Sequence, residues 1–276
     1  MKTLYVTDLD GTLLNTRSFI NPESLEIING LVRQGMIFTY ATARSVSSAS
    51  KVTRGLHLQH PLITYNGAFL IAPESREIMV KETFSEEEIC FVQGVLEDTG
   101  ISPLVYGFVE GAERVTWVTS RENIGIRHYI DGRPEDPRLR PLSSPEGLYD
   151  GEIFYFTCIA EQKELEPLRE FFMADERFTC TFQQELYREE YWFEIMPKKA
   201  TKAQGILRLK KLLGCDRVVS FGDGINDLPM FSISDECYAV ENAVQELKAA
   251  ATRIIGSNDE NGVALWLKEN FAANKE

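Results

Sequence analysis

The order of apolar and polar positions predicts a strand near the start of the chain, followed by helices and strands in turn. Residues 4–7 combine apolar, aromatic and β-branched side chains, as strands do. Apolar residues then recur at helical spacing from Pro22 to just before Gly35. A nearly continuous apolar run at 36–41 is typical of a strand covered on both faces, and residues 61–65 predict a third strand. This β-α-β-α-β order predicts a parallel sheet with right-handed crossovers.

The pattern changes between residues 84 and 193, where hairpin-like strand pairs alternate with helices. Strands are expected at 104–109, 115–119, 152–160, 178–182 and 191–195. Helices are expected at 85–97, 123–129 and 163–173, whereas residues 133–145 hold four prolines and predict a loop. Past Pro197 the α/β alternation returns. The pattern therefore predicts an α/β core made of residues 1–83 and 194–276, with an α+β insertion at 84–193.

Composition is that of a globular protein and excludes several classes of function. The 276 residues suffice for one large or two moderate domains. A formal net charge of −13 argues against general binding of nucleic acid or anionic membrane. The five cysteines are scattered without a C-x-x-C pair, so neither a zinc site nor a disulfide framework is indicated. With no signal-peptide pattern and no apolar run long enough to span a bilayer, a cytoplasmic location is expected.

Polar side chains follow the strands of the predicted sheet. Asp8 and Asp10 come after the first strand, and both carboxylates are expected on one side because residues i and i+2 of a strand point the same way. The clusters after other strands are Thr42 with Arg44, Asn66, and Asp223 with Asn226 and Asp227. In open α/β sheets ligands bind beyond the carboxyl ends of the strands, where these clusters would converge.

The chemistry of these side chains indicates a divalent cation and phosphoryl transfer. Neighbouring carboxylates repel each other unless a cation lies between them, and Mg²⁺ takes oxygen ligands. An aspartate beside a metal can also act as a nucleophile. Lys202 starts a predicted helix, and helix N-termini favour anions. Phosphoryl transfer requires such positioned charges, although D-x-D-G taken alone also fits a turn at a strand end.

The chain resembles phosphatases of the haloacid dehalogenase (HAD) superfamily, of the Cof type, over nearly its whole length. Residues 8–13 (DLDGTL) match the first motif of that family, and residues 222–227 (GDGIND) match the fourth. Residues 66–68 (NGA) and 257–264 (SNDENGVA) resemble further Cof-type signatures. The resemblance implies a Rossmann-like core with helices on both faces of the sheet, and a large α/β cap of the C2 type at 84–193.

The resemblance also implies how the aspartates divide the chemistry. Asp8 would be the nucleophile and a Mg²⁺ ligand. Asp10 would be the general acid/base, with its backbone carbonyl also on the metal. Asp223 and Asp227 would complete the metal site, directly or through water.

Five further positions would bind the substrate. Thr42 would hold the transferring phosphoryl group, Lys202 would neutralise it and orient Asp8, and Asn226 would lie close by. Arg44 and Asn66 are weaker candidates for substrate contacts. Thr42 also fits a helix cap, Arg44 a structural ion pair and Asn66 a turn.

Two matched segments depart from the family pattern. The second motif has Ala43 where glycine is usual, which adds a Cβ where the backbone approaches the ligand. The lysine motif, residues 198–203, ends in alanine where glycine is common. Lys202 is our choice within it because it heads the helix, and Lys198 and Lys199 are the alternatives.

Other residues that attract attention have a structural interpretation. Asn242 reads as a turn or cap residue. The three histidines show no metal spacing and are expected at the surface. The aromatic residues expected in the core of the insertion are Trp117, Tyr155, Phe156 and Trp192.

The predicted function is the Mg²⁺-dependent removal of phosphate from small phosphorylated metabolites, with sugar phosphates foremost, through an aspartyl-phosphate. Two alternatives stay open: a phosphotransferase or phosphomutase that uses the same intermediate, and a non-catalytic phosphate-sensing module. The expected partner is a small metabolite, with neither nucleic acid nor membrane. The protein is expected to be a monomer or a weak homo-oligomer, and the insertion is expected to close over the site.

Overall fold

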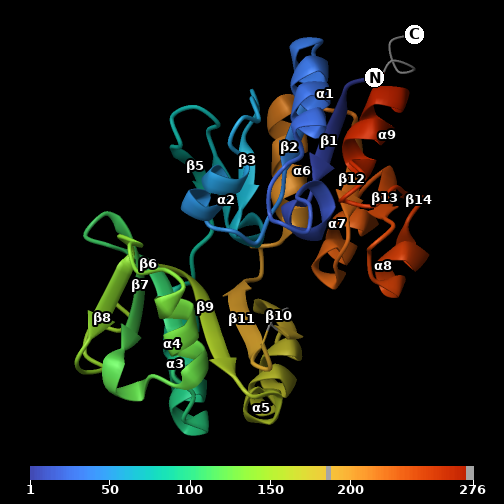
Figure 1. The fold of residues 1–276 in the computed structure, drawn as a ribbon. Helices are drawn as coiled ribbons and strands as arrows, with labels where there is room; N and C mark the ends of the chain where they lie inside the picture. The colour runs from blue at the N-terminus through green and yellow to red at the C-terminus, as the bar shows by residue number, and fades with distance from the viewer. Residues whose placement is uncertain (185–187, 272–276) are drawn as a thin grey trace. The chain divides into compact units, whose positions relative to one another are not determined.

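The computed structural model describes residues 1–184 and 188–271 (Figure 1). The chain divides into two compact units: the first combines Met1–Lys81 with the chain from Ala200 onward, and the second is Glu82–Lys199. The boundary expected after residue 193 falls inside strand β11 (Tyr191–Pro197), which belongs whole to the second unit. The reason is that β11 pairs with its neighbour β10 (Phe178–Gln184) along its entire length.

The first unit is built on a five-stranded sheet with the order β14-β13-β12-β1-β2. Its strands are β1 (Thr3–Thr7), β2 (Ile37–Tyr40), β12 (Arg217–Gly222), β13 (Glu236–Val240) and β14 (Arg253–Ile255). Every neighbouring pair is parallel. Leu4, Tyr5 and Val6 of β1 are all buried, as a strand covered on both faces requires. The predicted α/β class with a parallel sheet is confirmed.

Helices connect the strands of this sheet. They are α1 (Pro22–Arg33), α2 (Val46–Val52), α6 (Lys202–Leu213), α7 (Leu228–Ser232), α8 (Gln245–Ala250) and α9 (Gly262–Asn270). Helix α1 packs against α9, and α6 packs against α7 (Figure 1). Among the described residues, no helix combines the length and apolar character needed to cross a bilayer.

The strand predicted at 61–65 does not join the parallel sheet as expected. Strand β3 (Leu62–Thr64) pairs antiparallel with β4 (Phe69–Ile71), which pairs with β5 (Ile78–Lys81) in a separate three-stranded sheet. A single parallel bridge, from Ala41 to Ile63, links β3 to the end of β2. The cause is the turn after β3, where the backbone of residues 65–67 has positive φ throughout and reverses the chain directly into β4.

The second unit is a six-stranded sheet with the order β10-β11-β9-β6-β7-β8. Its remaining strands are β6 (Leu104–Val109), β7 (Ala112–Val118), β8 (Leu139–Leu142) and β9 (Glu152–Ala160), and its helices are α3 (Glu86–Thr99), α4 (Ile124–Asp131) and α5 (Gln162–Met173). Phe156, Phe172 and Phe193 are among the side chains of its buried core. Trp117 and Tyr155 are also buried, as predicted, whereas Trp192 is half-buried.

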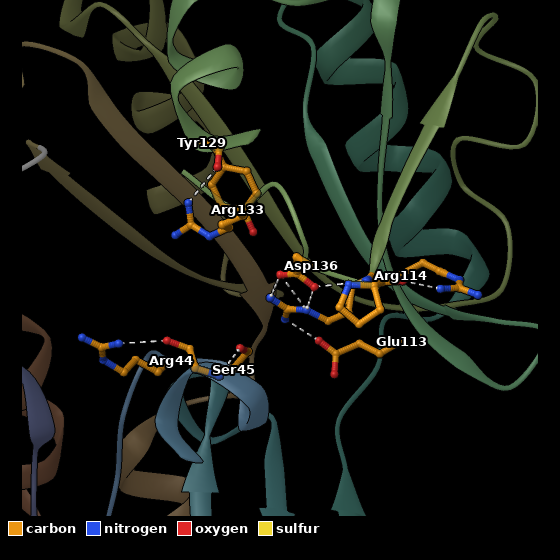
Figure 2. A network of polar contacts seen from close by, with 10 residues as sticks. Arg44, Ser45, Glu113, Arg114, Tyr129, Arg133 and Asp136 are labelled. Carbon is orange, nitrogen blue, oxygen red and sulfur yellow. Dashed lines mark hydrogen bonds and ion pairs between the residues drawn. The ribbon is translucent and has the colours of Figure 1, made fainter. Parts of the chain in front are cut away.

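The predicted loop at 133–145 instead contains β8, which pairs with β7 at the edge of the sheet. Proline cannot donate a hydrogen bond to a neighbouring strand, but an edge strand tolerates Pro141 because one of its sides has no partner strand. Charged side chains fix the approach to this strand: Arg138 Nη1 bonds Glu113 at 2.7 Å and Arg138 Nη2 bonds Asp136 at 2.6 Å (Figure 2). The hydrogen bonds from Arg138 lower the pKa of Asp136, although partial burial opposes them. This segment is therefore ordered by long-range contacts that its prolines do not reveal.

Candidate active site

Asp8 stands directly after β1 and is held by the neighbouring strand. Its N–H donates to the Phe221 carbonyl of β12 at 2.9 Å, and its side chain is only 8% exposed. A tight turn at Leu9–Leu13 follows, in which Gly11 has φ +76°. A Cβ on Gly11 would lie 2.2 Å from Asp223 Oδ2. Only glycine therefore lets this turn approach the second acidic segment.

The segment after β12 supplies two further carboxylates. Asp227 is fully buried, and its Oδ2 accepts hydrogen bonds from the N–H groups of Asp223 at 3.0 Å and Gly224 at 3.1 Å. The Thr12 hydroxyl donates to Asp223 Oδ1 at 2.9 Å. The two motifs, far apart in sequence, thus fix each other through these side chains.

Lys202 places a buried positive charge between two of the carboxylates. It is the first residue of α6 and is 2% exposed. Its Nζ donates to Asp8 Oδ1 and, at 2.7 Å, to Asp227 Oδ1. Although burial opposes the charge, Asp227 and Asp8 raise the pKa of Lys202 above its usual range. By contrast, Lys198 and Lys199 are exposed and lie in the second unit.

The start of α6 is positioned by the turn after β3. Thr201 caps the helix by accepting from the Gln204 N–H at 3.1 Å. Gly67 has φ +99°, and a Cβ there would lie 2.0 Å from the Thr201 carbonyl oxygen. The turn and the helix N-terminus are therefore in direct backbone contact, which holds Lys202 in place.

Asp8, Asp223 and Asp227 form a cluster that fits a divalent cation. Each offers a carboxylate oxygen, and these three atoms lie within 4.8 Å of one another. Burial raises the pKa of Asp8 well above its ordinary value, and Lys202 offsets part of this shift. Burial, reinforced by the charge of Asp227, raises the pKa of Asp223 to about 6. Three carboxylates against one lysine leave an excess of negative charge, which suits a hard cation with oxygen ligands.

The Asp10 carboxylate is not part of this cluster, contrary to the expectation that Asp8 and Asp10 point to one side. Its two oxygens pair with Arg44 Nε and Nη2, both at 2.6 Å, and the side chain is 50% exposed. The strand ends at Thr7, and the turn that follows does not keep the side-chain alternation of a strand. Within the described chain, the acidic group close enough to share a cation holds three side chains rather than four.

Thr42, Arg44 and Asn66 are joined through the backbone at the ends of β2 and β3. The Thr42 N–H donates to the Ile63 carbonyl at 3.0 Å, and the Asn66 N–H donates to the Thr42 carbonyl at 2.9 Å. Thr42 Oγ1 accepts from the Arg44 N–H at 3.1 Å. Ser45, and not Thr42, caps helix α2. The structure thus brings these residues together beside the turn that approaches α6.

Asn226 is half-buried in the turn next to Asp227. Among the described residues, its side chain makes no hydrogen bond to the carboxylates of the cluster. Asn242, interpreted from the sequence as a turn or cap residue, instead donates from Nδ2 to the Gly11 carbonyl at 2.7 Å. Asn258 supports it, because the Asn258 N–H donates to Asn242 Oδ1 at 3.1 Å. The sequence signature at 257–264 pointed to Asn258, but the sequence did not show that Asn258 contacts Asn242.

Comparison with known proteins gives a consistent result. The family model for haloacid dehalogenase-like hydrolases matches residues 5–267. A Bacillus subtilis 5-amino-6-(5-phospho-D-ribitylamino)uracil phosphatase is 25% identical over 95% of this chain and 96% of its own. A putative phosphatase of Buchnera aphidicola is 27% identical over 100% of this chain and 98% of its own.

Solved structures share the fold over both units. A haloacid dehalogenase-like hydrolase from Bacteroides thetaiotaomicron superposes with a TM-score of 0.80 at 23% identity, covering 98% of this chain and 100% of that one. A sugar phosphatase of HAD subclass IIB superposes with a TM-score of 0.75 at 23% identity, covering 98% and 99% of the two chains. At these identities the likeness shows the fold alone.

Proposed function

Because the chain belongs to the family of haloacid dehalogenase-like hydrolases, we propose that it removes phosphate from small phosphorylated metabolites with the help of Mg²⁺. Membership of this family confirms the resemblance stated from the sequence, and the named relatives identify the enzyme type as a phosphatase. One observation supports the proposal most strongly. The buried Asp8 carboxylate shares a cluster with Asp223 and Asp227 and is bound by Lys202.

In the proposed reaction Asp8 is the nucleophile. A carboxylate oxygen of Asp8 attacks phosphorus, the bond from phosphorus to the leaving oxygen breaks, and Asp10 gives that oxygen a proton. Asp10 then takes a proton from water as the water attacks the aspartyl-phosphate, which releases phosphate and restores Asp8. Mg²⁺ held by Asp8, Asp223 and Asp227, with the Asp10 carbonyl as a further ligand, would neutralise charge on the phosphoryl oxygens.

The remaining site residues bind the phosphoryl group in this proposal. Lys202 orients Asp8 through the contact described above and neutralises the incoming phosphate. We propose that Thr42, Asn66 and Asn226 contact the substrate beside Asp8. A phosphotransferase or phosphomutase with the same intermediate, and a phosphate sensor, are the alternatives. A sensor has no need of an Asp10-type acid, so the enzyme remains the first choice.

The substrate class is proposed from chemistry and from the relatives. One relative is named for a phosphorylated ribityl compound, and one structural neighbour is titled a sugar phosphatase. We therefore expect a phosphorylated sugar or sugar alcohol. The second unit is proposed to act as a cap that excludes water during the reaction, which would favour small substrates over phosphoproteins.

The test is release of inorganic phosphate from 4-nitrophenyl phosphate and from a panel of sugar phosphates, with Mg²⁺ and with excess chelator. Turnover should require Mg²⁺ and should be lost in Asp8→Asn, because an amide is a poor nucleophile. Asp150→Asn, a change at an exposed residue of the second unit, serves as the matched control. Full turnover in chelator would exclude a requirement for Mg²⁺, and an active Asp8→Asn variant would exclude Asp8 as the nucleophile.

A further inference from the structure

The contact between Arg44 and Asp10 is the feature of the site that the proposed reaction does not yet use. Both oxygens of Asp10 are engaged, with Nε bonded to Oδ2 and Nη2 bonded to Oδ1. The two residues are separated by 34 positions and come from different strand ends. A two-point contact of this kind fixes the plane of the carboxyl group as well as its position.

Arg44 itself is anchored on three sides. Its Nη1 donates to Ser48 Oγ at 2.8 Å on helix α2. Its N–H donates to Thr42 Oγ1 at 3.1 Å, and its carbonyl accepts from the Tyr65 N–H at 3.0 Å. The Arg44 side chain is largely buried, whereas Asp10 stands half-exposed in a turn. The arginine is therefore the fixed partner, and the aspartate is the one whose orientation it sets.

The contact between Arg44 and Asp10 also affects the acidic cluster. Asp10 is two residues from Asp8, yet its carboxylate stays apart from Asp8, Asp223 and Asp227. A free carboxylate at this position would be attracted to any cation held by the cluster. The contact with Arg44 provides an alternative counter-charge at 2.6 Å and holds the Asp10 carboxylate apart from the cluster.

We propose that Arg44 is a positioning residue for the acid–base step and acts through Asp10. Opening one of the two hydrogen bonds frees one Asp10 oxygen to face the leaving group, while the other oxygen stays bonded to the guanidinium. This assignment rests on the proposed role of Asp10 as general acid/base. It replaces the expectation that Arg44 contacts the substrate.

The experiment measures how the rate depends on the leaving group. Single-turnover rates are compared for 4-nitrophenyl phosphate, whose leaving group needs little protonation, and phenyl phosphate, whose leaving group needs more. Asp10→Asn should lose far more rate on phenyl phosphate, because acid–base assistance is worth about 10²–10⁴-fold. Arg44→Gln should show the same selectivity at a smaller size, about ten- to a hundredfold, since misplacing a catalytic group costs up to about 10²-fold.

Controls separate this role from a structural one. The double variant Asp10→Asn/Arg44→Gln should be no more selective than Asp10→Asn, because Arg44 has nothing left to orient. Arg44→Lys should recover part of the loss, since an ammonium can bond one carboxyl oxygen. If Arg44→Gln does not fold, Ser48→Ala takes its place as the test. This change removes the hydrogen bond from Arg44 to Ser48 but keeps the guanidinium, and it should shift the leaving-group selectivity in the same direction. Arg54→Gln, at an exposed arginine just after α2, should behave as the unmodified protein.

Each other outcome overturns the assignment. Equal slowing of both substrates by Arg44→Gln would make Arg44 structural, and a raised KM with unchanged kcat would make it a substrate contact. A selective Asp10→Asn beside an unselective Arg44→Gln would remove this inference and leave the proposed function intact. An unselective Asp10→Asn would remove the acid–base role of Asp10 and this inference with it.

Discussion

Replacing Lys202 by methionine tests the electrostatic organisation of the site most directly. Methionine keeps much of the length and apolar stem of lysine but carries no charge. In the folded protein, Lys202 Nζ bonds Asp8 and Asp227, whose side chains are 8% and 1% exposed. Lys202→Met therefore leaves two buried carboxylates without the cation that both of them bind.

The size of the effect follows from burial. Removing one partner from a buried ion pair costs about 3–5 kcal/mol, because the remaining charge is neither hydrated nor paired. At 2–4 °C per kcal/mol for units of 150–250 residues, this lowers Tm by roughly 6–20 °C. The loss should also depend on pH. Burial raises the pKa of Asp8, so its proton is bound more tightly in the folded state. Stability from that proton is present below the unfolded pKa and is lost as pH rises through the folded pKa.

The assay is thermal unfolding followed by circular dichroism in the presence of a chelator, at about pH 5.5 and about pH 8. Lys211→Met is the matched control, because Lys211 lies on the same helix, nine residues or about two and a half turns after Lys202, and is exposed. Lys202→Met should lose more Tm at the higher pH, whereas Lys211→Met should lose little at either. A Lys202→Met protein as stable as the control, or a loss that shrinks as pH rises, would refute this reasoning.

Three further predictions follow from single contacts. Mg²⁺ at a hundred times its Kd should stabilise the protein by about 2.7 kcal/mol, measured as a rise in Tm. This rise should shrink below about pH 6, where Asp223 holds a proton, and should vanish in Asp223→Asn. A rise that persists in Asp223→Asn would exclude this metal site. Gly67→Ala should lower both Tm and turnover, because the new Cβ would meet the Thr201 carbonyl at 2.0 Å. The control is Gly35→Ala, at φ +92° with nothing within 4 Å of the new Cβ, which should cost only the backbone strain of about 1–2 kcal/mol. Equal losses of Tm in the two variants would contradict the contact between Gly67 and Thr201. Burial raises the pKa of Glu194, so the stability that its proton contributes is complete below the unfolded pKa of about 4.3 and is lost as pH rises through the folded pKa. Glu194→Gln should therefore lose less Tm than the unmodified protein between about pH 5 and about pH 8, and parallel Tm profiles would contradict this.

The sequence by itself determined the class of the fold and the identity of the two acidic motifs. Local patterns were sufficient for this, because a buried parallel strand requires a continuous apolar run such as that of β1. The turn residues after β1 and β12 are likewise encoded locally, as Gly11 with its positive φ illustrates. These features depend on neighbours within a few residues, which is the range over which a pattern can be read.

Only the tertiary structure decided which side chains meet. Asp10 turns toward Arg44, 34 residues away, and Asn242 bonds the Gly11 carbonyl, 231 residues away. The same holds for strand β3, which the reversal at residues 65–67 sends into a second sheet. The direction of a side chain after a strand ends depends on the turn dihedrals and on the partner that satisfies its charge. Because that partner is supplied by a distant segment through packing, the local pattern around Asp8 and Asp10 could place both carboxylates near the site but could not separate them.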